Sequence, residues 1–354
     1  MRIKIAIVER DNNFLDRIVS TFNLKYAETL TVYSFTDYSR AVSASKEIRF
    51  DMVLISETMD VDISEISYRC AIAYLVESIG IDKINDQWAI SKYQRIDLIY
   101  KQILSIYSEK MPNSISLESE IGSGEVLIFC SPGGGVGSSS MAAATSVYFA
   151  RNNKKTLYLN FERFGASDVF FNAPGQFDMS DIIFALKSRK TNLALKLESC
   201  VKQDNRGVFF YSKAKSALDI LELKAEEIIN LISELKITGG YDYIIIDTEF
   251  SLGGKMLKIY NQASSLIFVS DGTEVCNSKI QRAFFALQEL EQNDELHILS
   301  RISLIYNKFR SKLSVPISSD IEINSIGGAP RYEHANTQQI ITQLSMLDFF
   351  AKIS

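Results

Sequence analysis

Short apolar runs alternate with amphipathic segments over residues 1–110. Apolar runs bounded by polar or turn residues predict strands, and apolar positions at helical spacing predict helices. The predicted strands are Ile3–Val8, Thr31–Ser34, Met52–Ile55, Ile72–Val76 and Trp88–Ile90, and the predicted helices are Asn13–Phe22, Asp37–Lys46 and Ile96–Tyr107. This alternation is typical of a parallel sheet with helices on both faces.

The same pattern restarts after residues 111–124, a stretch rich in Ser, Gly and Glu that is predicted to be a linker. The later strands are predicted at Val126–Phe129, Thr156–Leu159, Tyr243–Ile246, Leu266–Val269 and Ile302–Tyr306, and the helices at Ser139–Arg151, Met179–Lys187, Ala225–Leu235, Lys279–Gln292 and Thr337–Phe350. We therefore expect two doubly wound α/β domains, at 1–110 and 125–354. Ligands of such domains bind at the carboxyl ends of the strands.

Composition narrows the class of protein. Of the 354 residues, 46% are hydrophobic and 23% charged, which is typical of a soluble globular protein, and the net charge of −5 gives no general attraction to nucleic acid or anionic lipid. The four cysteines are widely separated and there are only two histidines, so neither disulfides nor a histidine metal site are expected. No signal sequence and no apolar run of about 20 residues is found, so we expect a cytoplasmic protein.

A glycine-rich loop carries the strongest candidate chemistry. It runs from Ser131 to Ser140, between a predicted strand and a small-residue helix, which is the setting of a phosphate-binding P-loop. Glycines let backbone N–H groups approach phosphate oxygens, and the helix N-terminus adds a favourable dipole. The candidate binding residues are Gly134, Gly135, Val136, Gly137, Ser138, Ser139 and Ser140. Ser138, however, stands where a P-loop has its lysine.

The first domain resembles a two-component receiver without its chemistry. The segments Ile3–Leu15, Phe50–Ser56 and Ala89–Lys92 resemble the receiver strands that carry the metal-binding carboxylates, the phosphoacceptor and the lysine. Ser56 replaces the acceptor Asp, and Arg10 replaces one of the two carboxylates. We expect a degenerate receiver used for docking, with phosphorylation at Ser56 or Asp51 as the alternative.

If the receiver chemistry is lost, Lys92 and Glu9 are expected to remain as an ion pair.

The second domain resembles the MinD/ParA branch of P-loop ATPases, whose motif reads KGGxGK[ST]. In that frame, Gly133 and Ser138 replace both lysines. The resemblance implies that Ser139 and Asp247, the latter at the end of the apolar run Tyr243–Ile246, hold Mg²⁺. It also implies that Glu162 positions an attacking water, although Asn160 departs from the Asp-x-Asp pattern of that strand.

The same resemblance places the base of the nucleotide. Asn307 would hydrogen-bond the adenine edge, and Pro330 and Arg331, in a predicted loop at 326–332, would lie along the base. ATP is favoured over GTP because Asn307 and Lys308 are not followed by the remainder of a guanine motif.

A degenerate receiver fused to a MinD-like ATPase is similar to the TadZ/CpaE family of tight-adherence (Flp, type IVb) pilus systems. The resemblance implies ATP-dependent homodimerisation, a position at a cell pole, and recruitment of pilus-assembly machinery with its secretion ATPase. The C-terminal segment 343–354 is apolar but scarcely basic, so it is expected to pack on the core rather than bind lipid.

Loss of the P-loop lysine is expected to affect hydrolysis more than binding, because backbone amides and Mg²⁺ remain for the ground state. The leading hypothesis is therefore an ATP-binding localisation scaffold with weak or absent hydrolysis. One alternative is an active ATPase with a relocated basic residue, for which Lys187, Arg189 and Lys190 are candidates. Another is an interaction protein that binds no nucleotide.

Overall fold

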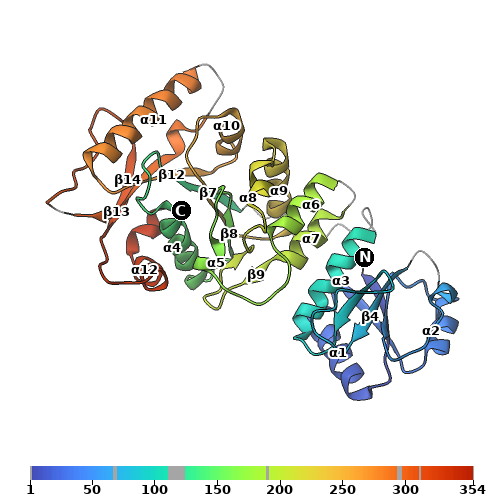
Figure 1. Ribbon diagram of the computed structural model, residues 1–354. Coiled ribbons are helices and arrows are strands. Elements are labelled where there is room, and N and C mark those ends of the chain that lie inside the picture. Colours follow the sequence, from blue (N-terminus) through green and yellow to red (C-terminus); the bar gives the residue numbers. More distant parts are fainter. Residues whose placement is uncertain are drawn as a thin grey trace. The chain divides into compact units, whose positions relative to one another are not determined.

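The computed structural model describes residues 2–66, 70–110, 124–188, 191–292, 297–310 and 312–353. It divides into two compact units, Met1–Ser116 with Ser188–Ser199, and Leu117–Lys187 with Cys200–Ser354. Figure 1 shows both, coloured along the chain. The predicted linker, apart from Gly124, lies outside the described residues.

The sheet of the first unit has the strand order β2-β1-β3-β4-β6-β5. Its strands are β1 (Ile3–Val8), β2 (Leu30–Phe35), β3 (Met52–Ser56), β4 (Ala71–Val76), β5 (Lys83–Ile84) and β6 (Gln87–Ser91). All neighbours pair in parallel except β5 and β6, which form an antiparallel hairpin. The carboxyl ends of β1, β3, β4 and β6 therefore meet at one edge.

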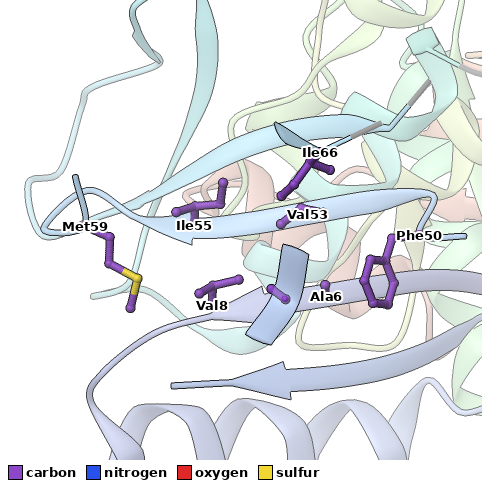
Figure 2. Close-up of a cluster of buried hydrophobic side chains, with 8 residues drawn as sticks. Ala6, Val8, Phe50, Val53, Ile55, Met59 and Ile66 are labelled. Atoms are coloured by element: carbon purple, nitrogen blue, oxygen red, sulfur yellow. The ribbon is translucent and has the colours of Figure 1, made fainter. Parts of the chain in front are cut away.

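Helices cover both faces of this sheet, with α1 and α3 on one side and α2 on the other (Figure 1). The elements are α1 (Asn12–Lys25), α2 (Tyr38–Ser45), the 3-10 turn η1 (Ile63–Glu65), α3 (Ile96–Lys110) and α7 (Leu193–Cys200). Asp11 caps α1 by accepting the N–H groups of Asn13 and Phe14. On the α2 side, alternate residues of β1 and β3 (Ala6, Val8, Val53 and Ile55) form the buried cluster of Figure 2 together with Phe50, Met59 and Ile66 from the connecting segments.

The segment that carries α7 comes late in the chain, yet residues 188–199 belong to the first compact unit. Lys196 of α7 is buried, and its ammonium donates to the hydroxyl of Ser105 at 2.8 Å and the carboxylate of Glu109 at 3.0 Å, both on α3. A buried charge is tolerated only with such partners, so the ion pair helps define where α7 packs.

The second unit contains an eight-stranded sheet in the order β14-β13-β12-β7-β11-β8-β10-β9. Its strands are β7 (Glu125–Cys130), β8 (Thr156–Asn160), β9 (Lys202–Gln203), β10 (Phe209–Phe210), β11 (Tyr243–Asp247), β12 (Ser265–Ser270), β13 (Ile302–Phe309) and β14 (Asn324–Pro330). Pairing is parallel except between β9 and β10. The predicted fold class, two doubly wound α/β units, is confirmed.

Helices α4 and α12 lie on one face of this sheet, and α10 and α11 on the other (Figure 1). The helical elements are α4 (Ser138–Arg151), α5 (Ser167–Phe170), α6 (Met179–Ser188), α8 (Ala217–Leu221), α9 (Ala225–Thr238), α10 (Gly254–Tyr260), α11 (Glu274–Gln292), η2 (Leu299–Arg301), α12 (Thr337–Leu344) and η3 (Asp348–Ile353). The last predicted helix is thus two elements. Phe350 of η3 is fully buried, with its ring 5.6 Å from that of Tyr148, so the chain end packs on this unit as expected.

The prediction of a loop at 326–332 is wrong for most of that range, because Ile326–Pro330 belong to β14. Two glycines made the segment look like a turn. A Cβ at Gly327 would lie 2.6 Å from the Cβ of Phe349, so this glycine permits close packing of η3 on the strand. Only Arg331 and Tyr332 of that prediction follow the strand.

Candidate functional site

The glycine-rich loop connects the carboxyl end of β7 to the first residue of α4. Gly135 and Gly137 have φ angles of 74° and 92°, in the left-handed region that side chains rarely adopt. Ser138, Ser139 and Ser140 form the first turn of α4 and are half-buried. The loop therefore joins strand to helix with the backbone that an anion-binding P-loop requires.

Gly133, where the MinD/ParA motif has its signature lysine, leaves little room for a side chain. It is buried, and a Cβ there would lie 2.6 Å from the Sγ of Cys276 on α11. A residue with a Cβ at this position would therefore require the Cys276 side chain or the loop to move.

Two consecutive residues at the end of β13 fasten the loop. The side-chain amide of Asn307 donates to the carbonyl of Val136 at 2.8 Å, and the ammonium of Lys308 donates to the carbonyl of Gly135 at 2.7 Å. Fixing these carbonyls also fixes the adjoining peptide N–H groups. The family resemblance assigns Asn307 to adenine alone and gives Lys308 no role, although the place of Lys308 beside Asn307 was the available signal.

Asp247 is the central carboxylate of the site. It ends β11, is fully buried, and pairs in register with Asn160 of β8. Its Oδ2 accepts the hydroxyl of Tyr158 at 2.6 Å and the amide of Asn160 at 3.0 Å, whereas its Oδ1 has no hydrogen-bond partner among the described residues. Burial, reinforced by the charge of Glu162, raises the pKa of Asp247 to about 8.

Asn160 links this carboxylate to the two other candidate residues. The hydroxyl of Ser139 donates to Glu162 Oε1 at 3.3 Å, and the Asn160 amide donates to Glu162 Oε2 at 3.4 Å while its Oδ1 accepts the Glu162 N–H at 3.0 Å. A carboxylate at 160 would add repulsion between Asp247 and Glu162, and an amide supplies a donor to both. Sequence reasoning recorded Asn160 only as a departure and overlooked Tyr158.

The donor set fits a magnesium ion. Mg²⁺ prefers carboxylate, hydroxyl, phosphate and water oxygens, and the unpartnered Oδ1 of Asp247 lies in a site that also contains the Ser139 hydroxyl. The described residues contain no group of three or more His, Cys, Asp or Glu side chains able to hold a metal by themselves. The remaining ligands would therefore be phosphate and water.

On the far side of Asn307, Pro330 pairs in register with Phe309 and lines an apolar groove of about 790 Å³ that also includes Tyr306. Arg331 is exposed and forms no hydrogen bond or ion pair within the described chain. The structure thus places Pro330 beside the end of β13, whereas no contact in the described chain holds the Arg331 side chain there.

Of the three candidates for a relocated cation, the structure describes only Lys187. Lys187 is exposed and pairs with Glu222 at 2.7 Å. Arg189 and Lys190 lie outside the described residues.

The receiver-like edge of the first unit is closed by its own side chains. The Lys92 ammonium lies 3.0 Å from Glu9 Oε2 and 3.4 Å from Glu77 Oε1, and Lys92 and Glu9 are both buried. Burial alone would lower the pKa of Lys92, but the hydrogen bonds and charges of Glu9 and Glu77 together outweigh burial and raise the pKa. Ser56 is fully buried, with its hydroxyl 3.0 Å from that of Thr58. The expected Lys92–Glu9 pair is confirmed.

The fold and the site define a P-loop protein of the α/β class with a receiver-like domain. Residues 1–108 match the family model described as "TadZ-like, receiver domain". No curated protein matches the chain.

Solved structures match the second unit. A ParA family ATPase from Chlorobium tepidum TLS is 20% identical, with a TM-score of 0.52 over 65% of this chain and 95% of that one. MinD in the MinC:MinD cell division complex of Aquifex aeolicus is 18% identical, with a TM-score of 0.51 over the same shares. Residues 1–108 therefore match a TadZ-like receiver domain, and the second unit has the MinD/ParA fold, as predicted. No helix in the described ranges has the length and hydrophobicity needed to cross a membrane.

Proposed function

We propose that this chain is an ATP-binding localisation and assembly scaffold of a tight-adherence pilus system. In this proposal it binds MgATP, forms a homodimer, and recruits the pilus-assembly machinery and its secretion ATPase to a cell pole in the cytoplasm. The TadZ-like receiver domain and the MinD/ParA fold support the TadZ/CpaE type of protein.

One observation carries the nucleotide part: the fully buried Asp247 has one carboxyl oxygen without a hydrogen-bond partner in the described chain, and the Ser139 hydroxyl is near enough to act on the pKa of that carboxyl. A buried, unpaired carboxylate oxygen costs stability unless a cation or donor meets it. When bound, Mg²⁺ would neutralise the phosphate charge. Ser139 and Asp247 would hold it, and the N–H groups of residues 134–140 would contact the phosphates.

The test is calorimetric titration of MgATP into the wild type, Asp247→Asn and a matched control, Asp16→Asn. Asp16 is exposed on α1 and has no hydrogen bond or ion pair among the described residues. We expect the wild type and the control to bind, and to gain roughly 2.7 kcal/mol of stability at a MgATP concentration 100 times the Kd. Asp247→Asn should lose both effects. Neither heat nor thermal stabilisation in the wild type would contradict the proposal.

Dimerisation and localisation are tested separately. Sedimentation of the 39.9 kDa chain should show a dimer with MgATP and a smaller species without it or in Asp247→Asn. A fluorescent fusion should form a polar focus in the native host, and Asp247→Asn should lose both the focus and surface pili. A focus and pili that persist in a variant that does not bind MgATP would favour the nucleotide-free interaction protein.

A second candidate, an active ATPase, is favoured by the contact between Ser139 and Glu162, which brings the proposed metal ligand beside the proposed water-positioning carboxylate. Without a P-loop lysine, we expect turnover on the order of 10² to 10³ times slower than with one. The test is phosphate release from MgATP by the wild type and by Glu162→Gln. Release by the wild type that is abolished in Glu162→Gln, while this variant still binds MgATP, would establish this candidate.

A further inference from the structure

A second cavity adjoins the metal-binding carboxylates. It has a volume of about 280 Å³ and is formed by the segment after β8, the start of α5 and α6, and the loop between β10 and α8. Its lining includes Asn160, Glu162, Arg163, Ser167, Lys213 and Lys215. The cavity thus begins at the two residues that surround Asp247 and extends toward the end of β10.

Two buried side-chain oxygens in the described chain have no hydrogen-bond partner. One is the hydroxyl oxygen of Ser167, a residue 1% exposed that lines the cavity. The other is Asp247 Oδ1, which lies behind the cavity-lining Asn160, the donor to Asp247 Oδ2 at 3.0 Å. The Ser167 hydroxyl can donate to an anion, and Asp247 can meet a cation once its carboxyl has lost its proton. A phosphate with a bound metal ion offers both partners.

The cations of the cavity differ in how they are paired. Arg163 is bound to Glu249 at 2.6 Å, and Lys215 lies 3.7 Å from Asp178. Lys213 is exposed, and its ammonium has no carboxylate within ion-pair distance among the described residues.

The backbone of Lys213 is nevertheless held in place. Its N–H donates to Asp168 at 3.0 Å, and the N–H of Lys215 donates to the Ser180 hydroxyl at 2.8 Å. Of the other acids near the loop, Asp219 accepts from the Ser180 hydroxyl, Asp178 from the Ser180 N–H and Asp181 from the Asp178 N–H. None of these carboxylates forms an ion pair with the Lys213 ammonium in the described chain, so this charge is available to an anion.

We propose that Lys213 and Ser167 recognise the terminal phosphate of the bound nucleoside triphosphate, supplying from the β10–α8 loop the cation that Gly133 and Ser138 lack. This rests on the proposed MgATP site. The glycine loop serves the phosphates shared by ATP and ADP. The cavity beyond Glu162 adds contacts that only a triphosphate reaches, so the site distinguishes ATP from ADP.

The experiment measures the Kd of MgATP and MgADP for the wild type, Lys213→Met, Ser167→Ala and Lys154→Met. Lys154 is a matched control, because it is exposed, has no ion pair in the described chain, and precedes β8 at the opposite edge of the sheet. Lys213→Met should weaken MgATP binding about tenfold or more, as expected for one charge-assisted hydrogen bond, and change MgADP binding less than about twofold. Ser167→Ala should weaken MgATP about three- to fivefold, and Lys213→Arg should retain the wild-type ratio.

Equal weakening of MgATP and MgADP by Lys213→Met, or an unchanged ratio of their Kd values, would overturn the inference and leave the proposed function intact. A wild type that binds neither nucleotide would overturn both. Because the Lys213 side chain is exposed, circular dichroism should show the same fold in this variant, and any change of ratio then reports on recognition.

Discussion

Each of the two units carries a site that departs from the motif of the family it resembles, and the two sites differ in which polar groups are left without a partner. At the receiver-like edge, Lys92 is paired with Glu9 at 3.0 Å, and Ser56 lies against Thr58 at 3.0 Å. Below the glycine loop, Asp247 has one oxygen without any partner in the described chain. The first site is complete without a ligand, and the second is not.

The difference shows how to distinguish a lost site from a modified one. Substitution of Ser56 for an acceptor Asp removes the charge that a metal would have met, and the remaining lysine is neutralised internally. Substitution of Ser138 for lysine removes a phosphate contact but leaves the carboxylate, the hydroxyl and the loop geometry in place. Whether buried charged groups have partners therefore says more about whether a site still needs a ligand than the number of motif residues that it retains.

The largest effect is expected from breaking the closed site. Lys92→Met leaves Glu9, whose side chain is 3% exposed, buried without its main partner, which should lower the free energy of unfolding by about 3–5 kcal/mol. Urea unfolding followed by fluorescence measures this in the first unit, because the single tryptophan, Trp88, lies in β6.

The double variant Lys92→Met with Glu9→Gln serves as the control, since it removes both charges and should recover most of the loss. If the single and double variants unfold alike, the buried ion pair is not what closes this edge.

A smaller effect is expected in the pH dependence of stability that Asp247 causes. The pKa of Asp247 is raised from 3.8 to about 8, so between these values the folded protein retains a proton that the unfolded chain releases. Stability should therefore fall as pH rises through this interval, by about 2 kcal/mol between pH 6 and 8, and level off above pH 8. In Asp247→Asn this part of the pH dependence should vanish.

The measurement is urea unfolding by far-ultraviolet circular dichroism at pH 6, 7 and 8, with the Trp88 transition determined separately. Asp16→Asn should keep the wild-type slope. If the free energy of unfolding depends on pH in the same way in Asp247→Asn and the wild type, Asp247 is not the group that causes this dependence.

The smallest effect is expected from a phosphodonor. Acetyl phosphate should leave no phosphate adduct on the intact mass of the protein, because Ser56 is fully buried and Lys92 is already paired. Ser56→Ala should behave in the same way as the wild type. An adduct that maps to Ser56 or Asp51 would restore the phosphorylated-receiver alternative.

Much of the fold followed from the apolar pattern, because buried parallel strands are continuous apolar runs. The strands from Ile3–Val8 to Ile302–Tyr306 were predicted close to their observed limits. The short β9 and β10, and β14 with its two glycines, were missed, because their pairing depends on neighbours rather than on local composition.

The same division applies to the site. Gly134–Ser140, Glu162 and Asp247 could be selected from the sequence, since each follows or precedes an apolar strand. Asn160 looked like a loss until its amide was found between Asp247 and Glu162. Lys308 had no assigned role until its contact with the Gly135 carbonyl was visible.

The sequence by itself determined the two α/β units, the glycine loop and the absence of both lysines, because strand periodicity and loop composition are local properties of the chain. Only the tertiary structure decided which polar groups are satisfied. Burial and hydrogen bonding join residues far apart in sequence. They pair Lys92 with Glu9, place Cys276 against Gly133, and leave an oxygen of Asp247 and one of Ser167 without a partner among the residues that the structure describes. Whether a polar side chain needs a ligand depends on its surroundings, and those form only when the chain folds.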